Sequence, residues 1–183
     1  MYVASKKRKE NVAEYLLYMW QIEDLIRANG LDLGKIEENV IGKSGLTEEQ
    51  RKEMLGWYES LIDMMRCEGV EQKGHLQINK NMIGQLADLH QTLLRDPKFQ
   101  DYHSEFYKTL PYIVELRSKA GEEKAGEIET CFNALYGWLL LRLKGQEISP
   151  ETQQAMAQIA RFVALLARDF HLDEQEKLFK REE

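Results

Sequence analysis

The chain has 183 residues, of which 43% are hydrophobic and 31% are charged, and its formal net charge is −6 at pH 7. This length and composition are typical of one globular domain with a core of ordinary size. The acidic balance argues against a general nucleic-acid-binding protein, because such proteins need a positive surface to bind phosphates.

The segment 11–29 is predicted to be the central helix. Between Val12 and Trp20 it carries one charged residue, Glu14. A helix that is apolar on most sides must be enclosed by other helices, so this segment indicates the middle of the fold. Its seam of apolar residues ends at Asn29-Gly30, which is a typical helix stop.

The rest of the chain is predicted to be helical as well, because apolar residues recur at spacings of three and four and strand-like runs are missing. Thr47-Glu48-Glu49-Gln50 is a capping box, and Asp96-Pro97 and Ser149-Pro150 are N-caps followed by proline. Long helices are therefore expected to begin near residues 11, 47, 75, 97, 122 and 150, with a short helix near 32–40. Pro111 should kink the fourth long helix.

Matched helix lengths and short connectors favour neighbours that pack antiparallel. The expected fold class is all-α: a single up-and-down bundle of about six long helices plus a short connector helix, over residues 1–183. A helical-repeat solenoid is the main alternative, but no repeat of about 34 or 40 residues recurs. Residues 1–9 are expected to be a flexible basic arm, and 172–183 a charged tail.

The basic cluster at 6–9 has two interpretations. It is either a solvated segment or an arm that contacts nucleic acid or an acidic partner. Cations at the start of the helix that follows would oppose its dipole, so the stability of that helix does not explain them.

Familiar catalytic and metal-binding motifs are absent from the sequence. It has no Glu-x-x-His, His-Glu-x-x-His, Cys-x-x-Cys, glycine-rich phosphate loop or Gly-x-Ser-x-Gly elbow. We therefore expect no cofactor and no metal, and name no catalytic residue. Cys67 and Cys131 are interpreted as small buried thiols in a reducing cytoplasm, and His90 and His103 as hydrogen-bonded histidines at the edge of the core.

Arg142 is the most informative polar residue, because it falls on the apolar seam of its predicted helix. It is either buried with a carboxylate partner or lies in the last turn and extends into solvent. If it is buried, it could help to line a polar pocket for a small anion inside the bundle. The candidate lining residues are Tyr18, Trp20, Asp24, Arg27, Trp138 and Arg142.

The opening KKRKENVAEYLLYMWQIEDLIR, together with the chain length, resembles an uncharacterised bacterial family of about 180 residues that is classed as a domain of unknown function. The resemblance covers the whole chain. It implies a stand-alone, all-helical, cytoplasmic protein, and it assigns no activity and no functional residue.

Two functional interpretations remain open at this stage. The first is a non-enzymatic interaction or regulatory module that self-associates, favoured by the density of apolar helices and by the ridge of Ala160, Ala164 and Ala167. The second is a small-molecule binding protein or enzyme that uses the anion pocket. We expect self-association, leave an unknown protein partner open, and expect neither a membrane nor nucleic acid as a partner.

Overall fold

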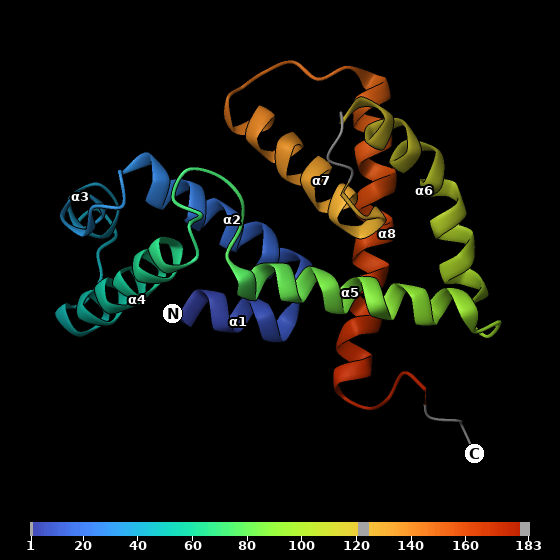
Figure 1. Cartoon of the computed structure of the whole chain (residues 1–183), viewed down its shortest axis with the longest axis horizontal. Coiled ribbons are helices and arrows are strands. Elements are labelled where there is room, and N and C mark those ends of the chain that lie inside the picture. Colours follow the sequence, from blue (N-terminus) through green and yellow to red (C-terminus); the bar gives the residue numbers. More distant parts are fainter. Residues whose placement is uncertain (1, 121–124, 180–183) are drawn as a thin grey trace. The chain divides into compact units, whose positions relative to one another are not determined.

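The computed structural model describes residues 2–120 and 125–179, and every regular element within these ranges is a helix (Figure 1). The predicted all-α fold class is confirmed. In chain order the elements are α1 (Tyr2–Glu10), α2 (Val12–Ala28), α3 (Leu33–Ile36), the π-helix η1 (Glu37–Ile41), α4 (Glu48–Cys67), α5 (Gln77–Arg95), α6 (Gln100–Lys119), α7 (Glu127–Leu143) and α8 (Pro150–Glu174).

The backbone contacts divide the chain into two compact units where the sequence pattern indicates one bundle. Unit 1 comprises residues 1–9 and 14–81, and unit 2 comprises 10–13 and 82–183. The boundary falls between Asn81 and Met82, inside α5. No linker composition marks it, because a continuous helix crosses it.

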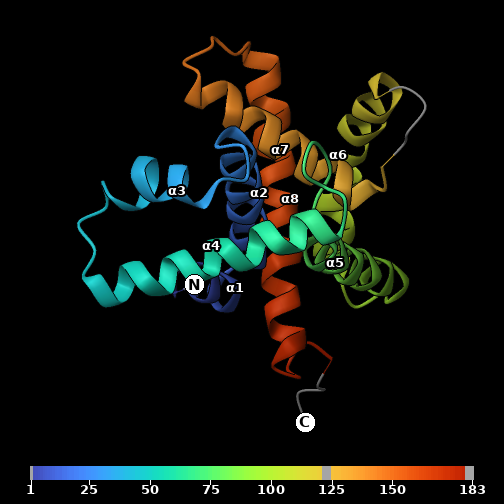
Figure 2. The same ribbon diagram turned by 60° about the vertical axis from the view of Figure 1, so that its left-hand side comes forward.

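Unit 1 is organised around α2, which is buried along most of its length as predicted. Leu16, Trp20 and Ile26 are among its fully buried side chains. Helix α4 contributes a further buried face through Tyr58, Leu61, Ile62 and Met65, and it contacts α3 and η1 (Figure 2). The apolar seams of α2 and α4 are therefore both buried in this unit.

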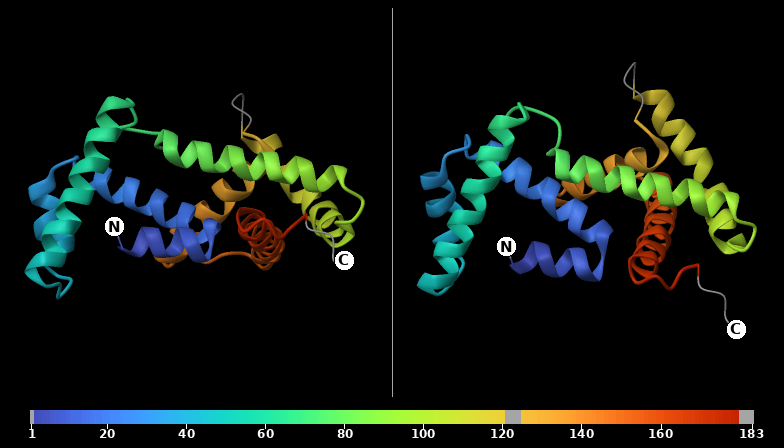
Figure 3. Two further views of the ribbon diagram at one scale, coloured as in Figure 1. Left: turned by 90° about the horizontal axis from the view of Figure 1, so that it is seen from below. Right: turned by 60° about the horizontal axis from the view of Figure 1, so that its bottom comes forward.

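Helix α1 is a difference from the sequence-based expectation of a flexible arm. Residues 2–10 are helical, and both views of Figure 3 show α1 beside α2. Lys7 Nζ lies 2.9 Å from Glu14 Oε2. Lys7, Arg8 and Lys9 occupy the last turn of α1, where positive charge stabilises the helix dipole. The basic cluster therefore has a structural role that its position before α2 concealed.

Unit 2 contains α6, α7 and α8, which contact one another, together with the second part of α5 and residues 10–13. Its centre is aromatic: Phe106 of α6 lies 5.6 Å from Phe162 of α8, measured between ring centroids. Phe132 of α7 and Ile159 of α8 are fully buried in the same unit. Offset and edge-to-face rings of this kind add to the stabilisation from apolar burial.

The cap predictions are confirmed at two of three helix starts. Thr47 and Gln50 form the capping box of α4, and Ser149 caps α8 with Pro150 in its first turn. The third prediction is wrong by three residues. The Asp96 side chain accepts a hydrogen bond from the Lys98 amide at 3.0 Å, which forms a turn, and α6 begins only at Gln100.

Three other sequence-based expectations concern these helices. Helix α6 continues through Pro111 to Lys119 without a break. The first residues of the predicted helix at 122–144 fall partly outside the described residues, and the described helix there begins at Glu127. The predicted tail is helical to Glu174, and 180–183 also lie outside the described ranges.

Within the part of the chain that is described, every helix is too short or too polar to cross a membrane.

Candidate functional site

The second half of α7 exposes an apolar surface. Tyr136, Leu139, Leu140 and Leu143 are spaced i, i+3, i+4 and i+7, which places them on one face of the helix. None of the four is buried, and Leu143 is 69% exposed. We call these four residues the α7 stripe.

The first half of the same helix is packed in the ordinary way. Ile128, Cys131, Phe132 and Leu135 are all buried. The fully buried side chains of α7 therefore lie in its first half, and those of its second half are partly buried or exposed. A contiguous apolar surface that a chain leaves uncovered commonly marks a contact site.

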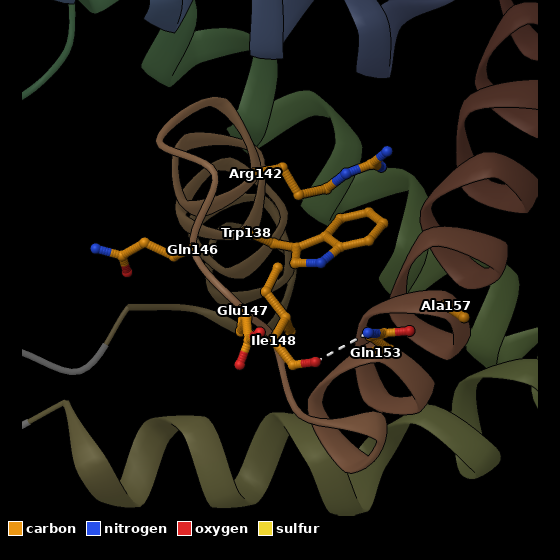
Figure 4. A pocket seen from close by; sticks show the side chains of 7 residues that line it. All are labelled: Trp138, Arg142, Gln146, Glu147, Ile148, Gln153 and Ala157. Atoms are coloured by element: carbon orange, nitrogen blue, oxygen red, sulfur yellow. Dashed lines mark hydrogen bonds between the residues drawn. The ribbon is translucent and has the colours of Figure 1, made fainter.

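A pocket of about 740 Å³ lies next to the α7 stripe, between the end of α7 and the beginning of α8. Trp138 and Arg142, four residues apart, line it from a different face of α7 (Figure 4). The other lining residues come from the connector and from α8: Gln146, Glu147, Ile148, Gln153 and Ala157. The pocket is open to solvent, because Arg142, Glu147 and Gln153 are all exposed.

The polar groups of this pocket have a defined arrangement. The Cζ atom of Arg142 lies 5.0 Å from the centroid of the Trp138 ring, a cation–π contact. Gln153 donates from Nε2 to the carbonyl of Ile148 at 2.9 Å, which joins α8 to the connector. The Nε1 atom of Trp138 is buried and has no hydrogen-bond partner among the described residues. In Figure 4 it faces Ile148 and Gln153.

The structure agrees with the second interpretation of Arg142, in which the side chain lies in the last turn of its helix and extends into solvent. It is exposed in the last turn of α7 and has no buried carboxylate partner among the residues described. Its pairing with Trp138 follows from their i, i+4 spacing, which the sequence shows. The contributions of Ile148 and Gln153 could not be found in this way, because they depend on how the connector folds back.

The other four candidate residues belong to unit 1. Arg27 binds Asp24 at 2.9 Å and also donates to the backbone carbonyls of Val70, at 3.0 Å, and Gly74. Trp20 stacks on the ring of His75, with centroids 4.0 Å apart. Tyr18 is half-buried, and burial raises the pKa of its hydroxyl, an effect that the nearby Lys7 partly offsets.

Glu23 organises a polar cluster that the sequence did not indicate. Its side chain is 1% exposed, and Oε1 accepts hydrogen bonds from the Leu76 amide at 3.0 Å and from Asn79 Nδ2 at 2.7 Å. Its other oxygen lies 2.6 Å from His75 Nδ1. The carboxylate therefore caps the start of α5 from another helix, where a negative charge is favourable.

Unit 2 contains a second buried polar cluster, centred on His90. Its Nδ1 lies 2.7 Å from the Tyr102 hydroxyl, and its Nε2 lies 3.4 Å from Glu127 Oε2. Burial lowers the pKa of His90 and raises that of Tyr102. His103 lies 2.9 Å from the Leu93 carbonyl through Nε2. Both histidines are hydrogen-bonded within the fold, as predicted, but His90 is fully buried and does not lie at the edge of the core.

The remaining residues that the sequence singled out are the two cysteines and the alanine ridge on α8. Cys131 is buried, but Cys67 is exposed, so the prediction of a buried thiol is wrong at that position. Cys67 is the last residue of α4 and lies off its buried seam. Of the alanine ridge, Ala167 is buried whereas Ala164 is exposed. In the described parts of the chain, no group of three or more His, Cys, Asp or Glu side chains could hold a metal ion.

Fold and site together define an all-α protein with a partly exposed apolar helix end beside an open polar pocket. The chain belongs to the family described as "Domain of unknown function (DUF4924)", whose model matches residues 1–177. No curated protein and no solved structure matches the chain.

Proposed function

We propose that the protein is a non-enzymatic helical interaction module that self-associates through the α7 stripe. The observation that carries this proposal is an apolar row on one helix face in which Leu143 is exposed and Tyr136, Leu139 and Leu140 are only partly buried. Each buried apolar side chain stabilises an interface by removing its surface from water, so a second helix laid along this face would gain stability.

A second copy of the chain is the partner that the local charges favour. Each copy has a net charge of −6, so two copies repel over most of their surface. Between Thr130 and Gln146, however, the chain has no acidic residue and only two basic ones, Arg142 and Lys144. An antiparallel contact about a two-fold axis keeps these two charges of one copy away from those of the other and opposes the two helix dipoles.

The size of the α7 stripe sets the expected strength of the contact. Four side chains over two helical turns fall well below the ~800 Å² per partner of a standard stable interface. We therefore expect a weak dimer whose population rises with protein concentration.

Two free cysteines in the described chain support a reducing compartment such as the cytoplasm for this protein.

The experiment is light scattering after size-exclusion chromatography over a range of protein concentrations. We expect the mass of the wild-type chain to rise toward that of a dimer, and Leu143→Asp to remain monomeric because the charge cannot be buried in the contact. Leu141→Asp is the matched control, since Leu141 is 38% exposed on the same helix but lies outside the stripe. A monomeric wild-type chain at all concentrations, or equal effects of both variants, would overturn the proposal.

A further inference from the structure

We infer that the pocket between α7 and α8 binds a small organic monocarboxylate. The first observation is the indole of Trp138. Its Nε1 is a buried donor without an acceptor among the described residues, and it lines the pocket. Buried indole N–H groups usually find a partner, because an unmade hydrogen bond costs the full desolvation of the donor. An acceptor oxygen can reach this buried atom only where Ile148 or Gln153, which it faces in Figure 4, moves aside.

The second observation is the guanidinium of Arg142. It stacks on the Trp138 ring and forms no ion pair with any described residue, so its planar donor fork is both oriented and available. Such a fork fits the two oxygens of a carboxylate. Because Trp138 and Arg142 are one helical turn apart, the guanidinium lies over the indole ring, and the ring holds it at the pocket for an anionic group.

The remaining lining residues narrow the class of anion. Glu147 also lines the pocket, and its negative charge repels a doubly charged ligand more strongly than a singly charged one. Ile148, Ala157 and the Trp138 ring offer apolar contacts for the body of the ligand. The volume of about 740 Å³ lies within the range of pockets for small organic molecules. An organic monocarboxylate meets these conditions better than inorganic phosphate does.

This inference is independent of self-association and is tested by nuclear magnetic resonance on the full chain. The signal is the indole Nε1–H resonance of Trp138, identified by its loss in Trp138→Phe. Benzoate is expected to shift this resonance in a saturable way. Benzamide has the same ring without the charge, and phosphate has the charge without the ring, and we expect both to shift it less than benzoate does.

Variants separate the role of Arg142 from general electrostatics. Arg142→Gln is expected to weaken benzoate binding by about tenfold or more, because a charge-assisted hydrogen bond is lost. Lys144→Gln removes the same charge two residues away, outside the pocket lining, and should change binding less than twofold.

The inference would be overturned by the absence of a benzoate-dependent shift of the Trp138 resonance, or by equal responses to benzoate and benzamide. An equal loss of affinity in both charge variants would also overturn it. Binding that persists in monomeric Leu143→Asp separates this result from the outcome of the self-association experiment.

Discussion

The carboxylate of Glu23 binds the imidazole of His75 at 2.6 Å, although the two residues are 52 positions apart in the chain. The same side chain accepts hydrogen bonds from the Leu76 amide and from Asn79. Glu23 of α2 therefore helps to hold the loop after α4 and the first turn of α5, where Glu68 also accepts a hydrogen bond from the Gln77 amide at 2.6 Å. In unit 1, the start of α5 is capped by tertiary structure in place of a local capping residue.

Replacement of Glu23 should destabilise the protein. Glu23→Ala leaves the Leu76 amide and the Asn79 side chain without their shared acceptor, and both residues are fully buried. We expect a loss of about 2–4 kcal/mol in the free energy of unfolding, measured by urea denaturation. Glu23→Gln keeps one acceptor oxygen and should cost less.

Glu14→Ala is the control for this measurement. Glu14 pairs with Lys7 at 2.9 Å, but its side chain is 60% exposed, so its loss should cost no more than about 1 kcal/mol. Equal losses for Glu14→Ala and Glu23→Ala would contradict the role of Glu23 as a buried cap.

The loop that follows α4 depends on Arg27 as well. Its guanidinium donates to the carbonyls of Val70 and Gly74, and its side chain is 15% exposed. Arg27→Met keeps most of the apolar stem and removes the donors, so amides near residues 70–74 should exchange with deuterium faster. Arg51→Met removes an exposed ion pair with Glu37 and should leave these amides unchanged. Unaltered exchange in Arg27→Met would show that the loop is held by other contacts.

Features set by neighbouring residues were predictable from the sequence. Thr47 and Ser149 cap the helices that they precede, because an N-cap depends on the amides two and three residues later. The i, i+4 pairing of Trp138 with Arg142 is local in the same sense. Helix α1 was missed because apolar residues do not recur at helical spacing in the segment YVASKKRKE. This helix is stabilised by the positive charges in its last turn and by the ion pair of Lys7 with Glu14.

Features set by distant residues could not be predicted in this way. The Glu23 cluster joins α2 to a loop more than fifty residues away, so no spacing indicates it. The division of the backbone contacts into two units leaves no mark in the sequence, because its boundary lies inside α5. Exposure also depends on tertiary structure: Cys67 and Cys131 both lie in apolar helical patterns, yet only Cys131 is buried.

The buried His90 predicts a pH dependence of stability in the mildly acidic range. Burial lowers its pKa in the folded protein below the ordinary value of 6.5, although the nearby Glu127 partly offsets this. The unfolded chain therefore binds a proton more readily than the folded chain. The stabilisation from neutral His90 is complete above pH 6.5 and is lost as the pH falls from 6.5 through the lowered folded value.

The measurement for His90 is urea denaturation at several pH values, comparing the wild-type chain with His90→Gln. The glutamine has no titrating group, so the variant should lose less stability than the wild-type chain between neutral and mildly acidic pH. Burial raises the pKa of Asp169, so Asp169 changes the free energy of unfolding with pH in the direction opposite to His90. Subtracting the stability curve of His90→Gln from that of the wild-type chain removes this effect. Parallel curves for the two proteins would contradict the assignment to His90.

The two thiols should differ sharply in reactivity. Cys67 is exposed at the end of α4, whereas Cys131 is fully buried and burial raises the pKa of its thiol to about 12. The thiolate is the reactive form, so Cys131 is protected both by its pKa and by its lack of access. A disulfide reagent such as 5,5′-dithiobis(2-nitrobenzoate) should label one thiol in the native protein and two in denaturant. Cys67→Ser should abolish the native reaction, and rapid labelling of that variant without denaturant would show that the interior of unit 2 opens on the timescale of the assay.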